Sequence, residues 1–341
     1  MAGRTGRGSG PVITDPFGRV LDYVRISVTD RCNFRCTYCM PPGGIPWIPH
    51  DEIMSYEDIL FLCGVLAALD VRKVRFTGGE PFVRKGFVPF LAEVRASFPG
   101  LRVAVTTNGT FLGEWAKVLS SLGLDSVNVS LDTLDTGKFA RGTGGGDLRR
   151  VLDGIEALRS SGGVPMKVNT VVMRDFNREE IPELTAFSGN AGLLHRFIEF
   201  MPLDGKVWSR ERFVSAEEIL SLFPGPFPWV PEMLASARSE APGPARYFIN
   251  PSGQRVGIIS AVSDHFCGRC NRLRISSTGT VRPCLFGNFG VSVIEGLRSR
   301  DGDLVRKGIQ EAVSGKPREG GTGIPVSGRG TGERHMWQIG G

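Results

Sequence analysis

The chain has 341 residues and a mass of 37.0 kDa, which is enough for two modest domains or for one barrel with an appendage. With 41% hydrophobic and 22% charged residues it can bury a core, so its composition excludes a wholly disordered protein. The net charge of +6 suits an anionic ligand as well as a nucleic acid, and it decides between neither.

The cellular location is predicted from cysteine usage and from apolar runs. No run of about 18 apolar residues is present, so no membrane-spanning helix is expected. Seven cysteines, an odd number in a long chain, argue against a secreted disulfide framework. The opening MAGRTGRGSG lacks the apolar segment of a secretory signal. We therefore interpret residues 1–16 as a disordered arm and expect a cytoplasmic protein.

Strand-like and helix-like segments alternate from Asp22 to about residue 223. The predicted strands are residues 23–28, 73–77, 102–107, 126–131, 167–173 and 194–200. The predicted helices are residues 59–70, after a capping box from Ser55 to Asp58, and residues 86–98, 114–124, 147–161 and 178–187. Repeated β-then-α order predicts an α/β fold with a parallel sheet. Six strands are too few for an eight-stranded barrel, so residues 17–223 are expected to form an open, partial (βα)6 TIM-like barrel.

The pattern changes after residue 223. A Pro-rich connector is followed by short β-like runs at 245–250, 255–259 and 273–277, which predict a small C-terminal α+β module over residues 224–314. Residues 315–341 are rich in Gly and polar residues and end in Gly340 and Gly341. We expect them to be a flexible tail.

A first group of three cysteines follows the first predicted strand. Cys32, Cys36 and Cys39 form C-x3-C-x2-C, a spacing that suits a soft metal or an iron–sulfur cluster. A structural zinc site needs four protein ligands, and no further Cys or His lies close in sequence. A [4Fe–4S] cluster held by three Cys leaves one iron open to a small molecule.

A second group of three cysteines lies in the C-terminal part. Cys267, Cys270 and Cys284 form C-x2-C-x13-C, which taken alone fits zinc with a remote fourth ligand such as His265. Two incomplete groups in one chain favour two clusters, each with an open iron. The seventh cysteine, Cys63, lies within an apolar helical segment and is expected in the core.

The first cysteine group resembles the signature of the radical S-adenosylmethionine (SAM) enzymes. The residues from Cys32 to Cys39, CNFRCTYC, match C-x3-C-x-aromatic-C, and GGEP at residues 78–81 resembles a second motif of that superfamily. The resemblance implies that the open iron binds SAM, and that an electron from the cluster cleaves SAM to methionine and a 5′-deoxyadenosyl radical.

The second cysteine group and its surroundings resemble the MoaA family, the GTP 3′,8-cyclases of molybdenum cofactor biosynthesis. The similar segments are FCGRCNRLR at 266–274, CLF at 284–286, DYVRISVTDRC at 22–32, VNTV at 168–171, RFIEFM at 196–201 and the terminal Gly-Gly. The resemblance covers roughly residues 17–290. It implies that the radical removes hydrogen from ribose C3′ of GTP, that C3′ attacks guanine C8, and that 3′,8-cyclo-7,8-dihydro-GTP is formed.

The resemblance also implies partners and a role for the second cluster. The cofactors would be two [4Fe–4S] clusters and SAM, with the open iron of the second cluster contacting the guanine. The partners would be the substrate GTP, a low-potential electron donor, a downstream cyclic pyranopterin monophosphate synthase and a second copy in a homodimer. Neither a nucleic acid nor a membrane is expected.

Site residues follow from the matched motifs. The SAM contacts implied by the resemblance are Tyr38, Gly79, Ser130 and Met201, and the GTP contacts are Arg25, Arg75, Thr106, Lys167, Arg272, Leu273 and Arg274. The residues themselves support a triphosphate ligand, because charges on strands that cross a sheet are costly unless paired. Arg272 and Arg274 are two apart, so on a strand they point to the same side beside the second cysteine group. By the resemblance, both arginines and the terminal Gly340 and Gly341 belong to the catalytic centre.

Two other functions are considered. A radical SAM maturase that modifies peptides would have extra cysteines around its auxiliary cluster and would lack the Arg272/Arg274 pair. A zinc-binding or nucleic-acid-binding module would have clustered Lys and Arg with stacking aromatics, whereas the positive charge here is dispersed.

Overall fold

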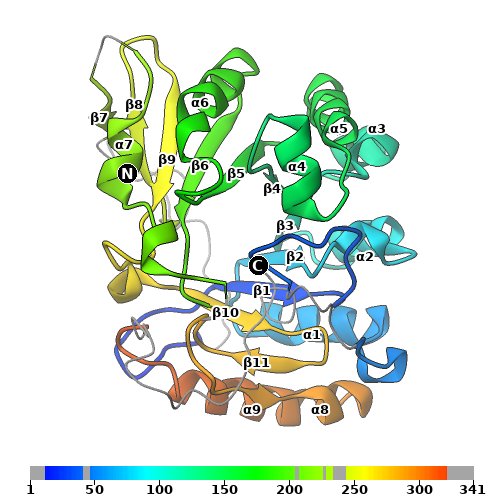
Figure 1. Ribbon diagram of the computed structural model, residues 1–341. Helices are drawn as coiled ribbons and strands as arrows, with labels where there is room; N and C mark the ends of the chain where they lie inside the picture. Colours follow the sequence, from blue (N-terminus) through cyan, green and yellow to red (C-terminus); the bar gives the residue numbers. More distant parts are fainter. Residues whose placement is uncertain (1–11, 41–46, 204–206, 226–227, 233–242, 321–341) are drawn as a thin grey trace, which may run out of the picture.

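A computed structural model describes residues 12–40, 47–203, 207–225, 228–232 and 243–320 (Figure 1). Its centre is one curved sheet with the strand order β12-β11-β10-β1-β2-β3-β4-β5-β6-β9-β8-β7. The strands are β1 (Tyr23–Ser27), β2 (Lys73–Thr77), β3 (Arg102–Thr107), β4 (Ser126–Ser130), β5 (Met166–Val172), β6 (Leu194–Glu199), β7 (Val230–Pro231), β8 (Arg246–Ile249), β9 (Arg255–Ile259), β10 (Arg272–Ile275), β11 (Thr280–Arg282) and β12 (Val291–Ser292).

The six predicted strands are all present, and each lies within one residue of its predicted ends. Strands β1 to β6 pair in parallel with their sequence neighbours. Since the strand order runs from β12 to β7 without β12 pairing with β7, the sheet is an open barrel rather than a closed one. The α/β class and the open, partial barrel are thereby confirmed.

The strands after residue 223 extend this sheet at both edges. Strand β9 pairs in parallel with β6, and β10 pairs in parallel with β1. Antiparallel neighbours then follow, β8 and β7 on one side and β11 and β12 on the other. The C-terminal part is therefore built into the barrel wall, and the boundary at residue 223 stays a prediction.

The helices lie on the outside of the curved sheet (Figure 1). They are α1 (Tyr56–Ala68), α2 (Phe87–Ser97), α3 (Leu112–Ser121), α4 (Thr136–Thr143), α5 (Leu148–Ser161), α6 (Ile181–Asn190), α7 (Ala216–Ser221), α8 (Ile294–Arg298) and α9 (Gly302–Ser314). The predicted capping box is confirmed, because Ser55 accepts from the Asp58 N–H and the Asp58 carboxylate accepts from the Ser55 N–H. Helices α4, α7, α8 and α9 were not among the predicted helices.

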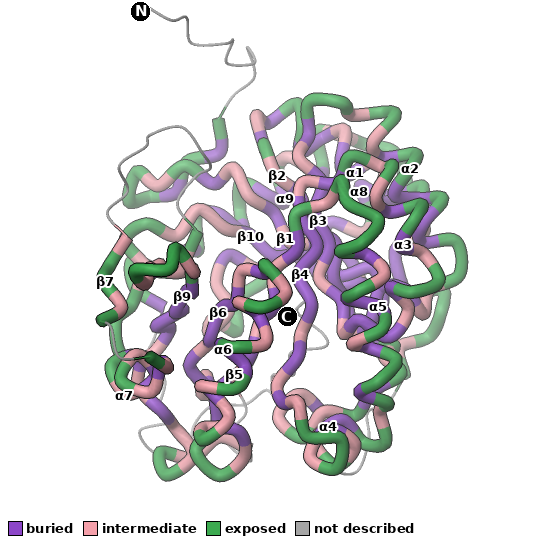
Figure 2. The backbone as a smooth tube through the Cα atoms, turned by 90° about the horizontal axis from the view of Figure 1, so that it is seen from above, coloured by how far each residue is buried: buried purple, intermediate pink, exposed green. Residues whose placement is uncertain are grey.

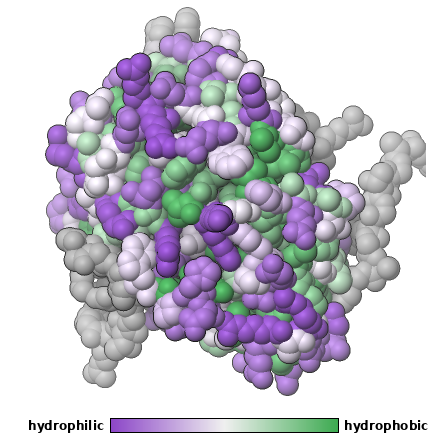
Figure 3. Space-filling model, turned by 90° about the vertical axis from the view of Figure 1, so that its right-hand side faces the viewer, coloured by the Kyte–Doolittle hydropathy of each residue, from purple (hydrophilic) through white to green (hydrophobic). Residues whose placement is uncertain are grey.

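The core lies between the sheet and the helices, where buried residues follow the strands (Figure 2). Apolar strand residues such as Ile26, Phe76, Val105 and Val127 are completely buried. Cys63 on α1 is also completely buried, which confirms its expected place in the core. The face with α2, α3 and α5 carries hydrophilic side chains with hydrophobic ones in small groups (Figure 3). Among the helices of the described residues, none has the length and apolar character needed to cross a membrane.

Candidate active site

Both cysteine groups line one cavity of about 1660 Å³ inside the barrel. The first group follows β1, whereas Cys267 and Cys270 precede β10, which runs parallel to β1. The two groups therefore lie at opposite ends of neighbouring strands. A five-residue strand at about 3.3 Å per residue separates them by roughly 16 Å along the strand direction. The first group thus lies at the carboxyl ends of the parallel strands, and the second group lies at their amino ends.

The loop of the first group is held against the GGEP segment. A Cβ on Gly79 would lie 2.4 Å from the Arg31 carbonyl oxygen, and one on Gly78 would lie 2.6 Å from that of Thr29, so neither position has room for a side chain. The Glu80 carboxylate accepts hydrogen bonds from the N–H groups of Phe82 (3.1 Å) and Asn108 (2.6 Å). Burial raises the pKa of Glu80 to about 7.

The donor set of the first group fits an iron–sulfur cluster. All seven cysteines of the chain are free thiols. The pKa of Cys36 is raised well above its ordinary value, mainly by burial and then by the nearby Cys39, Asp132 and Cys32. Buried sulfurs crowded in this way need a positive partner before they ionise, and iron ions supply one.

The residues implied for SAM binding, Tyr38, Gly79, Ser130 and Met201, all line the cavity. The Tyr38 hydroxyl donates to Asp132 Oδ2 (2.8 Å), and Asp132 Oδ1 accepts from the Val171 N–H (2.8 Å). Burial raises the pKa of Asp132 to about 6. Because its hydroxyl is engaged with Asp132, Tyr38 offers its ring and backbone to a ligand.

The second group differs from the first in its electrostatics. Burial raises the pKa of Cys270, but Arg272 and Lys316 lower it by more, so that the net shift is downward. Arg272 also stacks over Phe266, with its guanidinium carbon 4.7 Å from the ring centroid. A thiolate is thus favoured at Cys270, which fits a ligand of an iron–sulfur cluster.

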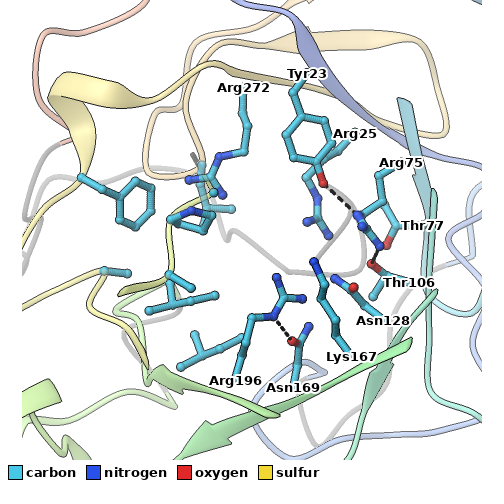
Figure 4. A pocket seen from close by; sticks show the side chains of 18 of the residues that line it. Tyr23, Arg25, Arg75, Thr77, Thr106, Asn128, Lys167, Asn169, Arg196 and Arg272 are labelled. Atoms are coloured by element: carbon cyan, nitrogen blue, oxygen red, sulfur yellow. Dashed lines mark hydrogen bonds between the residues drawn. The ribbon is translucent and has the colours of Figure 1, made fainter. Parts of the chain in front are cut away.

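Cationic side chains from five strands enter the cavity between the two cysteine groups (Figure 4). They are Arg25 of β1, Arg75 of β2, Lys167 of β5, Arg196 of β6, and Arg272 and Arg274 of β10. Register pairs Arg25 with Arg274 across the β1–β10 ladder. Burial first, and then the neighbouring arginines, lower the pKa of Arg25 to about 10 and that of Arg274 well below its ordinary value. So many like charges in one cavity favour the binding of an anion.

Arg75 is held by its neighbours on β1, β3 and β4. Its Nε donates to the Tyr23 hydroxyl (2.8 Å), and its other nitrogens donate to the Val105 carbonyl (2.6 Å), Thr106 Oγ1 (3.5 Å) and Ser126 Oγ (2.8 Å). Arg75 is 3% exposed. These bonds fix Thr106 and Tyr23 in place on either side of it.

Tyr23 gives the stability of the chain a testable pH dependence. Burial raises the pKa of its phenol, but Arg75, Arg25 and Lys73 lower it by more, to about 7 from an ordinary 10. Between pH 7 and 10 the folded chain thus binds fewer protons than the unfolded chain, so the free energy of unfolding rises with pH and this contribution is lost as pH falls through 7. Urea unfolding of the iron-free chain at pH 7 and 9 should show a smaller rise for Tyr23→Phe than for the wild type. If the free energy of unfolding rises equally in Tyr23→Phe and in the wild type, the lowered pKa of Tyr23 is contradicted.

Most predicted site residues meet in this one cavity. Leu273 is the exception among the described ones, since it is buried (1% exposed) and does not line the cavity. Gly340 and Gly341 lie outside the described residues. Residues missed from the sequence include Arg196, whose Nε donates to Asn169 Oδ1 (2.9 Å), and Tyr23. Arg196 carries the same signal as Arg25 and Lys167, a cationic residue within a predicted strand.

Comparison with known proteins agrees with this site. Residues 26–187 match the model of the radical SAM superfamily, and residues 194–321 match the model "Molybdenum Cofactor Synthesis C". The fold, the CNFRCTYC loop and the GGEP segment thus define a radical SAM enzyme.

The individual relatives are more specific. A GTP 3′,8-cyclase of Geobacter sulfurreducens is 40% identical over 311 residues, covering 91% of this chain and 94% of the relative. One of Thermodesulfovibrio yellowstonii is 41% identical over 307 residues, covering 89% and 94%. Molybdenum cofactor biosynthesis protein 1 of Drosophila melanogaster is 39% identical over 286 residues, covering 84% of this chain and 50% of that one. The chain belongs to the GTP 3′,8-cyclase family.

Proposed function

We propose that this chain converts GTP to 3′,8-cyclo-7,8-dihydro-GTP with SAM as the radical source, the first step of molybdenum cofactor biosynthesis. The observation that carries the proposal is the cavity in which the two cysteine groups lie at opposite ends with a cluster of cationic side chains between them. The relatives named as GTP 3′,8-cyclases support the same reaction.

At one end of the cavity, Cys32, Cys36 and Cys39 would hold a [4Fe–4S] cluster that, when bound, supplies the electron for SAM cleavage. Tyr38, Gly79, Ser130 and Met201 would hold SAM there. The absence of a side chain at Gly79 keeps the GGEP backbone open to a ligand, and Asp132 keeps the Tyr38 ring in place.

In the middle of the cavity the cations would bind the triphosphate of GTP. Arg25 of β1, Lys167 of β5, and Arg272 and Arg274 of β10 enter the cavity from three strands, so a ligand with several charged oxygens would contact them simultaneously. Arg75, with its nitrogens bonded to Tyr23, Val105 and Ser126, would place Thr106 for a further contact. At the far end, Cys267, Cys270 and Cys284 would hold a second [4Fe–4S] cluster next to the guanine, with Leu273 packing behind it.

The proposal is tested with anaerobically reconstituted protein, reductant, SAM and GTP. We expect 5′-deoxyadenosine and a product with the mass of GTP that is absent when SAM is left out. Mass spectrometry and chromatography of the quenched mixture measure both. The alternative result is that 5′-deoxyadenosine forms while GTP is unchanged and another nucleotide or a peptide is modified. That result would contradict GTP as the substrate but would agree with a radical SAM enzyme.

The remaining proposals concern partners and organisation. We propose a low-potential electron donor, a downstream cyclic pyranopterin monophosphate synthase, a homodimer in the cytoplasm, and entry of Gly340 and Gly341 into the active site. The division into an arm (1–16), a barrel (17–223), a C-terminal module (224–314) and a tail (315–341) is proposed with them.

A further inference from the structure

Residues 316–320, here called the strap, lie against the second cysteine group. Lys316 is 4% exposed although it lies only two residues after α9. Its Nζ donates to the Arg272 carbonyl (2.9 Å), to the Pro283 carbonyl (2.6 Å) and to Cys270 Sγ (3.8 Å). The three N–H groups of the ammonium therefore join the segment of Cys270 to the segment of Cys284.

The other end of the strap reaches the remaining cysteine. The Gly320 N–H donates to Cys267 Sγ (3.2 Å). A Cβ on Gly320 would lie 3.3 Å from Cys284 Sγ and 3.5 Å from Cys267 Sγ, so the Gly320 backbone lies between these two sulfurs. Lys316 and Gly320 thus reach all three members of the group.

A residue near the other end of the chain fixes the strap. Arg19 Nη1 donates to the carbonyls of Cys267 (2.7 Å) and Arg318 (2.9 Å), and Nη2 donates to that of Pro317 (2.6 Å). The Arg19 Nε is bound in turn by the Asp15 carboxylate. Three segments far apart in sequence therefore meet at the second cysteine group, and none of these bonds is needed to form the sheet.

We propose that Lys316 is a positioning residue of the second iron–sulfur centre and that its charge sets the reduction potential of that centre. The inference rests on the proposed function in one respect, that this cysteine group holds a cluster. A buried ammonium bonded to a ligand sulfur stabilises the additional negative charge of the reduced cluster. The two carbonyl bonds keep the Cys270 and Cys284 segments at the spacing that the cluster requires.

The test uses the full-length chain in which Cys32, Cys36 and Cys39 are replaced by serine, so that only the second cluster remains. Lys316→Met is compared with the parent by iron and sulfide content and by a redox titration followed by electron paramagnetic resonance. We expect partial loss of iron, and a cluster that is harder to reduce. A tenfold lower ratio of reduced to oxidised cluster at a fixed potential is a shift of about 59 mV for one electron.

The matched control is Lys307→Met, which removes an exposed lysine from α9 and should change neither reading. Lys316→Arg, which keeps the charge, should retain more of the parent potential than Lys316→Met. If Lys316→Met has the iron content and the reduction potential of the parent, the inference is wrong. It is also wrong if Lys316→Met, made in the wild-type chain, causes a general loss of folding that removes the first cluster as well. If the parent chain binds no cluster, the proposal that the second cysteine group holds a cluster is wrong.

Discussion

Cys36→Ser is expected to abolish reductive cleavage of SAM, and with it any change in GTP. Cys36 is the middle cysteine of the first group, and Cys39 is joined to it by a backbone hydrogen bond from the Cys39 N–H to the Cys36 carbonyl (2.9 Å). A serine hydroxyl is a poor substitute for a thiolate as a ligand to iron of an iron–sulfur cluster. The measurement is 5′-deoxyadenosine formed per chain under anaerobic, reducing conditions.

Cys284→Ser, at the other end of the cavity, separates the two steps. It should impair product formation from GTP more than it impairs SAM cleavage, because the first cysteine group and the proposed SAM contacts are untouched. The ratio of 5′-deoxyadenosine to cyclised product should therefore rise. Equal loss of both steps in a protein with an intact first cluster would contradict this division of labour.

Cys63→Ala is the control for both serine variants. Cys63 is completely buried in α1 and lines no part of the cavity. Its replacement lowers stability through a small gap in the core but should leave iron content and the ratio of the two products at wild-type values. A change in that ratio would show that the assay responds to stability rather than to the clusters.

The strands of the barrel were predictable because their local sequence decides them. Short apolar runs such as Val103 to Val105 are bounded by turn residues and are separated by segments with helical periodicity. The ends of each predicted strand agree with the structure to within one residue. Helix α4 was missed because its eight residues include Gly137 and Gly142, which favour coil. Its start is set instead by the Asp135 side chain, which accepts from the Lys138 N–H (2.6 Å).

The arrangement of the site was less predictable, because it depends on pairing between distant strands. Nothing in the residues around Cys267 reveals that β10 pairs in parallel with β1, yet this pairing places the second cysteine group at the opposite end of the barrel from the first. Lys316 was likewise overlooked, since it opens a segment whose composition is typical of a flexible tail. A single lysine becomes informative only when burial shows that its charge has partners.

The second large effect is expected at Lys167, which extends into the cavity between Arg25 and Arg196 (Figure 4). Lys167→Met should raise the KM for GTP by about 10- to 100-fold, because a hydrogen bond to a charged group contributes about 1.5–3 kcal/mol and each 1.4 kcal/mol is about tenfold in affinity. The uncoupled cleavage of SAM without GTP should stay unchanged, since Lys167 lies away from the first cysteine group along β5.

The specificity of that effect is measured against Lys117→Met, which removes an equal charge from the exposed face of α3. Steady-state product formation over a range of GTP concentrations, repeated at two salt concentrations, distinguishes local contact from the overall field of the protein. A contact with phosphate makes the KM of the wild type more sensitive to salt than that of Lys167→Met, because the variant has lost one charge that the salt screens. If Lys117→Met raises the KM as much as Lys167→Met, the cavity lysine acts only through net charge and the proposed triphosphate site loses one of its contacts.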